Sequence, residues 1–166
     1  MNFAHSIDTR KNSLKKLLTN VIKYEDEIIK ALFDDFKKPA FEAVATETSY
    51  IISDLKDTIA NIDSYCKPKK VKFNLLNFPS NDYIIFEPYG KVLIIAPWNY
   101  PFQLAICPLV AAVAAGNTVV LKPSELTPHT SAIIAKIIIE SFEKNHVSVE
   151  QGGQEKSTEL LNQRWD

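Results

Sequence analysis

Two long stretches in the first half of the chain carry apolar residues at spacings of three and four, which is typical of amphipathic helices. They cover residues 8–36 and 41–65, and Lys38-Pro39 separates them. The second stretch stops at the basic, proline-containing sequence Lys67-Pro-Lys-Lys70. Each predicted helix has one apolar face, so each needs another element to cover that face.

From residue 89 onward the pattern changes to strands that alternate with helices. The strands are predicted at residues 91–96, 118–121 and 147–149, and the helices from Pro101 to Gly116, from Thr127-Pro128 to Phe142 and from Ser157 to Arg164. The first strand is a continuous apolar run, as expected for a strand buried on both faces of a parallel sheet. This order favours an α/β fold with part of a right-handed, doubly wound, Rossmann-like parallel sheet.

Residues 73–88 lie between the two patterns and are predicted to form an extended arm. Two short apolar segments flank the turn sequence Pro79-Ser-Asn-Asp82, as in a hairpin. Because an isolated two-stranded ribbon is marginally stable, we hypothesise that another subunit completes it. The expected organisation is N-terminal helices over residues 1–70, an arm over 71–88 and the first part of a dinucleotide-binding domain over 89–166.

Composition narrows the possible functions. The formal net charge of −1 gives no electrostatic case for binding nucleic acid or an anionic membrane. No apolar stretch approaches the roughly 20 residues of a membrane span. Two cysteines are too few for a disulfide scaffold, so we expect a cytoplasmic chain with reduced thiols. The histidines, His5, His129 and His146, lack metal-ligand spacing, so no metal site is expected.

The turn after the first strand is the leading candidate for chemistry. It places Asn99 at the carboxyl end of a predicted parallel strand, where α/β proteins bind ligands, and its amide can donate a hydrogen bond there. Position alone favours another role for Asn99, the N-cap of the helix that begins at Pro101. Trp98 by itself favours packing. Cys107 lies within the same predicted helix, where a buried inert thiol is favoured over a nucleophile.

The turn after the second strand is Lys122-Pro-Ser-Glu125. The Glu125 carboxylate can accept hydrogen bonds from a ribose diol, and Lys122 can donate to the same ribose or to a phosphate. Spacing alone favours the alternative, a solvated loop with a carboxylate near a helix start. The four glycines allow neither a Walker-type loop nor a Gly-x-Gly-x-x-Gly turn, which constrains every nucleotide-binding hypothesis.

Several motifs, in this order and spacing, resemble the aldehyde dehydrogenase superfamily, and in particular its class 3 or fatty-aldehyde-like branch. They are Glu87-Pro-Tyr-Gly90, Ala96-Pro-Trp-Asn-Tyr-Pro-Phe102, Ala114-Ala-Gly-Asn117, Val120-Leu-Lys-Pro-Ser-Glu125, Gly152-Gly153 and Ser157-Thr-Glu-Leu-Leu161. The similarity covers nearly the whole chain. The family's sheet lacks the usual glycine fingerprint, which agrees with the scarcity of glycine.

The resemblance implies roles for seven residues. Asn99 matches the family's oxyanion-hole amide, which stabilises the alkoxide that develops when a cysteine thiolate attacks an aldehyde. Lys122 and Glu125 match the pair that holds the adenosine ribose, so the implied cofactor is NAD or NADP. The turn that lines the nicotinamide end is matched by Ile95, Ala96, Pro97 and Trp98.

The resemblance also implies what these residues lack. The family's general-base glutamate and nucleophilic cysteine come later, and neither Cys66 nor Cys107 stands in a matching motif. We therefore expect the N-terminal cofactor-domain portion of an NAD(P)-dependent aldehyde dehydrogenase, inactive by itself, whose whole enzyme acts on an aldehyde. An open sheet edge after the third strand predicts a homodimer or higher oligomer. The alternatives are a stand-alone nucleotide-binding module and an oligomerisation module.

Overall fold

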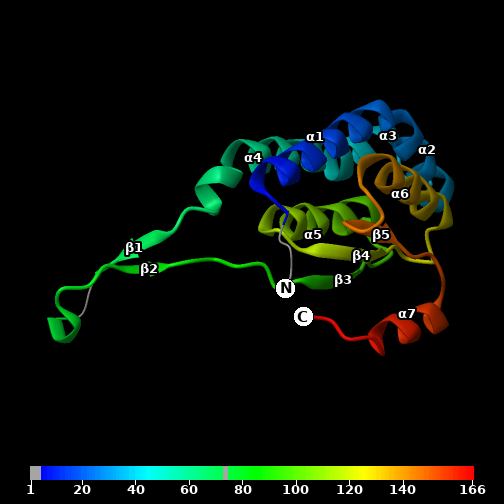
Figure 1. Ribbon diagram of the computed structural model, residues 1–166. Helices are drawn as coiled ribbons and strands as arrows, with labels where there is room; N and C mark the ends of the chain where they lie inside the picture. Colours follow the sequence, from blue (N-terminus) through cyan, green and yellow to red (C-terminus); the bar gives the residue numbers. More distant parts are fainter. Residues whose placement is uncertain (1–4, 73–74) are drawn as a thin grey trace.

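The computed structural model describes residues 5–72 and 75–166, and its centre is a parallel sheet (Figure 1). The strands are β3 (Lys91–Ile95), β4 (Thr118–Lys122) and β5 (Val147–Val149), in the spatial order β3-β4-β5. Helices α5 (Pro101–Ala115) and α6 (Pro128–Ser141) connect the strands and pack on one face, and α7 (Gln154–Leu161) lies on the other side. The predicted α/β fold with a parallel sheet is confirmed.

The N-terminal helices form a second layer over α5 and α6. Helix α1 (Ile7–Lys23) contacts α4 (Ser49–Tyr65), α5 and α6, while α2 (Glu25–Phe36) contacts α6. Their apolar stripes are fully buried at Leu14, Leu17, Val21, Ile28, Leu32, Ile51, Leu55 and Ile62. The partner that these amphipathic faces require is therefore the helical layer that covers the sheet, and both layers share one hydrophobic core.

The single helix predicted over residues 8–36 is wrong in one respect, because it breaks at Tyr24, whose φ and ψ are −105° and 15°. The Tyr24 hydroxyl donates to the Glu140 carboxylate on α6 at 2.8 Å, and the Lys136 ammonium lies 3.9 Å from the Tyr24 ring centroid. Both α1 and α2 contact α6, and the break lies where Tyr24 is anchored to that helix. Local periodicity does not encode these contacts.

The second predicted helix is helical from Ala40 to Tyr65, but it is not a uniform α-helix. It consists of α3 (Ala40–Ala43), a π-helical turn (Val44–Thr48) and α4. π-Helical turns inside helices occur frequently at functional sites. This turn carries Glu47, a fully buried carboxylate.

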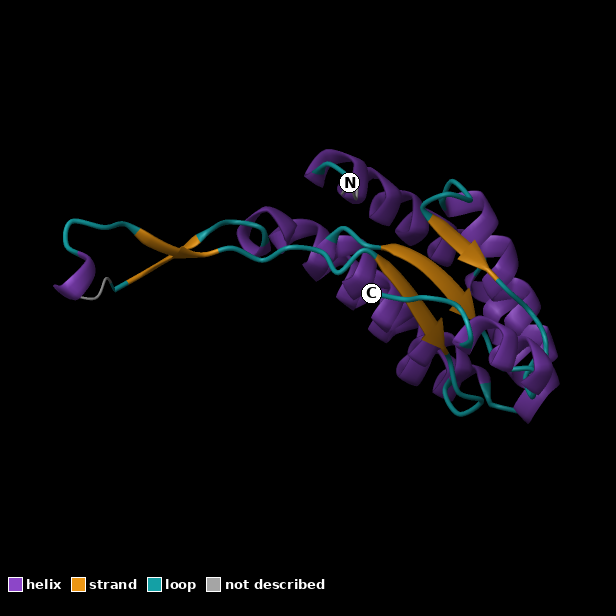
Figure 2. Cartoon of the chain, turned by 60° about the horizontal axis from the view of Figure 1, so that its bottom comes forward, coloured by secondary structure: helices purple, strands orange, loops and turns teal. Residues whose placement is uncertain are grey.

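The arm is a ribbon that extends away from the helices and the sheet in both views (Figures 1 and 2). Strand β1 (Lys69–Val71) pairs antiparallel with β2 (Asp82–Ile84), and a 3-10 turn occupies Leu75–Asn77. The first of the two extended segments predicted within residues 73–88 is therefore wrong. The strand that pairs with β2 begins at Lys69, before that range. Phe73, where the first predicted extended segment begins, lies outside the described residues.

Two further boundaries differ from the prediction. Helix α7 begins at Gln154, three residues before the expected Ser157, and ends at Leu161. The segment after it returns to the sheet, where the Asp166 N–H donates to the Lys91 carbonyl at 3.1 Å. Within the described residues, β3 and β5 each pair with a strand on one side only, so the expected open edge is present.

The described residues contain neither a membrane-spanning helix nor a metal-binding cluster. None of the helices there is both long and apolar enough to cross a membrane. In the same part of the chain, no three histidine, cysteine or acidic side chains gather in a way that could hold a metal ion.

Candidate functional site at the carboxyl ends of the strands

The carboxyl ends of β3 and β4 bring two of the predicted segments together. Ile95 is the register partner of Lys122, and the Ala96 N–H donates to the Lys122 carbonyl at 2.9 Å. Ala96 is buried, whereas Ile95 is 43% exposed and the following Pro97 and Trp98 are exposed. The two turns thus lie side by side at the sheet edge where α/β folds bind ligands.

Lys122 and Glu125 form an ion pair in which Lys122 is buried and Glu125 is exposed to solvent. The Lys122 ammonium, on a side chain only 1% exposed, donates to the Glu125 carboxylate at 2.9 Å and to the Pro123 carbonyl at 3.2 Å. The hydrogen bond from Lys122 lowers the pKa of Glu125, so the half-exposed carboxylate is ionised at neutral pH. The Lys122 ammonium is fixed in place and can donate, and the Glu125 oxygens can accept. Together they match a ribose diol, whose hydroxyls both donate and accept hydrogen bonds.

The loop that carries this pair is tied to α6 by buried hydroxyl groups. The Ser131 and Thr127 hydroxyls donate to the Ser124 carbonyl at 2.6 and 3.3 Å. Thr127 stands at the predicted N-cap position of α6, but its side chain makes no capping hydrogen bond. The Asp35 carboxylate of α2 accepts the Thr130 N–H at 2.8 Å instead. A tertiary contact has replaced the local cap.

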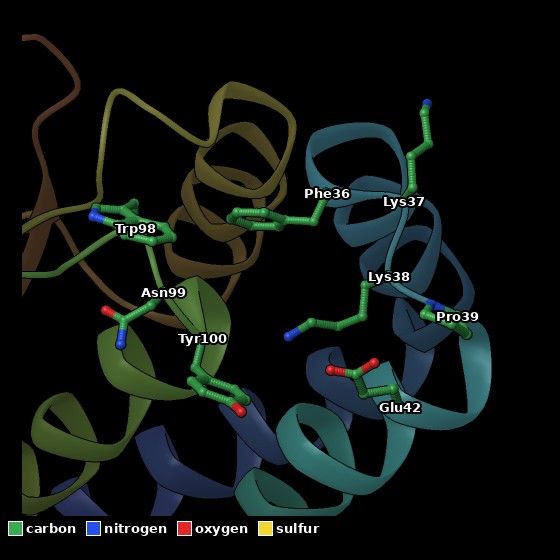
Figure 3. A pocket seen from close by; sticks show the side chains of 8 residues that line it. All are labelled: Phe36, Lys37, Lys38, Pro39, Glu42, Trp98, Asn99 and Tyr100. Atoms are coloured by element: carbon green, nitrogen blue, oxygen red, sulfur yellow. The ribbon is translucent and has the colours of Figure 1, made fainter.

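The Asn99 turn borders a hollow of about 280 Å³ (Figure 3), lined by Phe36, Lys37, Lys38, Pro39, Glu42, Trp98, Asn99 and Tyr100. The Phe36 and Trp98 ring centroids are 6.5 Å apart. Figure 3 shows the Lys38 side chain pointing between Tyr100 and Glu42, with Asn99 extending to the opposite side. Lys122 and Glu125 do not line this hollow, so the structure places the two candidate functions on neighbouring strand ends but not in one cavity.

The alternative role of Asn99 as a helix cap is wrong. The residue that precedes α5 is Tyr100, which has a left-handed backbone (φ 48°, ψ 53°) and no capping side-chain hydrogen bond. Asn99 is exposed, and its amide makes no side-chain hydrogen bond within the described residues. The amide is therefore available to donate to a ligand.

Glu47 supplies the cap of α5, and the sequence reasoning missed it. Its carboxylate accepts the Phe102 N–H at 2.9 Å and the Gln103 N–H at 3.2 Å, and it also pairs with the Lys38 ammonium. One signal was present in the sequence, because Glu47 stands four residues after Ala43 and four before Ile51, both of them apolar. A carboxylate within an apolar stripe needs buried partners.

Neither cysteine is placed as a nucleophile for this site. Both are free, and neither lines the hollow beside Asn99. Burial, with the charge of Asp54 as a second cause, raises the pKa of Cys107 to about 11. The thiolate is the reactive form, so Cys107 is almost entirely unreactive thiol at neutral pH.

The chain is similar in sequence to proteins of one family. Residues 3–164 match the aldehyde dehydrogenase family. The 4,4'-diaponeurosporen-aldehyde dehydrogenase of Staphylococcus aureus is 44% identical over 160 residues, which are 96% of this chain and 35% of that protein. Aldehyde dehydrogenase family 3 member H1 of Arabidopsis thaliana is 40% identical over 157 residues, which are 95% of this chain and 32% of that protein. The chain therefore spans about a third of the length of these relatives.

Solved structures show the same arrangement. A substrate-bound AldH of Staphylococcus aureus matches with a TM-score of 0.93 and 43% identity, over 96% of this chain and 35% of that one. An NAD+ complex of a Bacillus cereus aldehyde dehydrogenase matches with a TM-score of 0.82 and 23% identity, over 96% and 32%. A Streptococcus pyogenes succinic semialdehyde dehydrogenase with NADP+ matches with a TM-score of 0.85 and 15% identity, over 98% and 35%. The last two likenesses bear on the fold alone.

Proposed function

Because this chain belongs to the aldehyde dehydrogenase family and is similar to its class 3 members, we propose that it forms the N-terminal part of the cofactor domain of an NAD(P)-dependent aldehyde dehydrogenase. The whole enzyme would convert an aldehyde to a carboxylic acid through a cysteine thiohemiacetal. The observation that carries this proposal is the pairing of Lys122 and Glu125 beside the exposed end of β3.

The strand ends would bind the cofactor, which accepts a hydride when it is present. The Glu125 carboxylate and the Lys122 ammonium would hold the adenosine ribose. The turn of Ile95, Ala96, Pro97 and Trp98 would line the nicotinamide end, with Ile95 and Trp98 supplying exposed apolar surface. No glycine-rich phosphate turn is needed for these contacts, which agrees with the four glycines of the chain.

Asn99 would be the oxyanion donor. Its role requires an amide that is free of internal partners and is held by its backbone, because a preorganised donor stabilises developing charge without reorganising. The exposed amide at a fixed turn supports this assignment. In the whole enzyme the nucleophile and the general base would come from outside these 166 residues.

Cofactor titration tests the proposal. We expect calorimetry to detect NAD binding to the chain, and Glu125→Gln to weaken that binding by about tenfold, because a charge-assisted hydrogen bond to the ribose is lost. NADP binding should weaken less, since the substitution also removes repulsion between Glu125 and a 2′-phosphate. Glu159→Gln, an exposed carboxylate on α7, is the matched control and should change neither affinity.

The same preparation should show no NAD(P)-dependent aldehyde oxidation, since neither of its cysteines is placed as a nucleophile. Absence of binding heat with millimolar NAD and NADP would overturn the cofactor role. Aldehyde oxidation by the pure chain would show that these residues contain a catalytic centre.

A second role, in subunit association, is favoured by the surface of the arm. Leu75, Ile85 and Phe86 are 83%, 65% and 60% exposed, and such apolar side chains on a projecting ribbon suit burial against another subunit. We expect the chain to be a homodimer or higher oligomer that requires the arm. Light scattering on a variant lacking residues 73–86 should give the monomer mass. An unchanged oligomer mass would remove this role.

A further inference from the structure

The N-terminus of α5, directly after Asn99, lacks a local cap. The first N–H groups of a helix have no partner within the helix and need acceptors from elsewhere. Tyr100 stands at the N-cap position without a side-chain capping bond, and Pro101, at N1, has no N–H. The donors that remain at this end are the N–H groups of Phe102 and Gln103, the two that an N-cap side chain normally serves.

Glu47 serves both donors from a different helix. One carboxylate oxygen accepts the Phe102 N–H at 2.9 Å and the Gln103 N–H at 3.2 Å. The side chain is fully buried, and the π-helical turn Val44–Thr48 carries it. A negative charge at this position is also favoured by the partial positive charge of the helix N-terminus.

Lys38 joins this cap to the turn itself. Its ammonium pairs with the other oxygen of the Glu47 carboxylate and lies 4.6 Å from the centroid of the Tyr100 ring. Tyr100 needs such support, because a left-handed backbone is unfavourable for a residue with a side chain. Conformations of this kind persist where the surrounding contacts hold them.

We propose that Glu47, together with Lys38, is a positioning residue for Asn99. The Glu47 carboxylate fixes the first turn of α5, and Lys38 holds the Tyr100 ring. The Asn99 side chain is thereby released from capping and kept pointing outward as a donor. This role rests on the proposed function of Asn99, although the positioning itself is a property of the chain without any ligand.

Nuclear magnetic resonance on the 166-residue chain tests the positioning. The variants are Glu47→Asp, which keeps the charge but shortens the reach, Glu47→Gln, which keeps the shape but removes the charge, and Lys38→Met. Glu42→Gln is the control, because Glu42 lines the same hollow without capping α5. The measurements are the exchange rates of the Phe102 and Gln103 amide protons and the side-chain amide signals of Asn99, with the Val119 amide as the reference for global stability.

In Glu47→Asp we expect the Phe102 and Gln103 amides to exchange about tenfold faster relative to Val119, and the Asn99 side-chain signals to shift or broaden. Lys38→Met should move the Asn99 signals with less effect on the two amides. A purely structural role would raise all exchange rates together and leave the Asn99 signals in place, and that result would overturn the proposal. If the Asn99 signals respond but no cofactor binds, the positioning stands and the proposed function fails.

Discussion

Replacement of Glu47 by alanine is expected to lower the free energy of unfolding by about 3–5 kcal/mol, because it leaves a buried charge without its partner. The Lys38 ammonium, whose side chain is 10% exposed, loses its carboxylate, and the N–H groups of Phe102 and Gln103 lose their acceptor. Urea denaturation followed by circular dichroism measures the loss.

The control for this substitution is Glu42→Ala, an exposed carboxylate on α3. It should change stability by less than about 0.5 kcal/mol, as is usual for a surface site. A loss below about 1 kcal/mol in Glu47→Ala would mean that water replaces the carboxylate, and the buried cap would then not be important for stability.

Acidification from pH 7 to pH 5 is expected to lower stability by about 1–2 kcal/mol through His146 alone. His146 is 3% exposed, its Nε2 has no hydrogen-bond partner within the described residues, and its ring lies 3.9 Å from the His5 ring, centroid to centroid. Burial first, and then the nearby His5 and Arg10, lower the pKa of His146 to about 4.

The sign of this effect follows from the order in which the two states take up protons. The unfolded histidine binds its proton near pH 6.5, whereas the folded one resists protonation until about pH 4. The stability that the neutral His146 contributes is therefore fully present above pH 6.5. It is lost as the pH falls from 6.5 toward about 4. Unfolding free energies measured at several pH values give the slope.

His146→Phe is the matched variant, because Phe142 already packs edge-on against this ring at 5.7 Å and the backbone hydrogen bonds of residue 146 remain. The difference in stability between the variant and the original chain should grow as the pH falls from 7 to 5. Parallel pH profiles of the two proteins would show that His146 does not titrate in this way.

Local signals predicted most of the fold. The helix from Pro101 to Gly116 begins with proline at N1 and ends at a glycine with φ 98°, both of which depend on nearby residues only. The strands follow from their continuous apolar runs. The expectation that the first of them is buried on both faces is wrong, because only Ile94 of β3 is buried and Ile95 is 43% exposed. The break at Tyr24 and the start of the ribbon at Lys69 were not found, because contacts with α6 and β2 set them.

Local signals likewise predicted only part of the candidate site. Lys122 and Glu125 are three residues apart, so their pairing is within reach of local reasoning. The local capping preference of Asn99 led to the wrong alternative, because the true cap, Glu47, is 55 residues from Phe102 in the sequence. Likewise Asp35, which caps α6, is 95 residues from Thr130.

The sequence by itself therefore determined the order of strands and helices, the two turns at the strand ends and the chemical groups that these turns carry. The tertiary structure alone decided which groups remain free to act. Helix N-termini must find acceptors, and the distant carboxylates of Glu47 and Asp35 meet that need at α5 and α6. As a result the Asn99 amide is left exposed and free to donate.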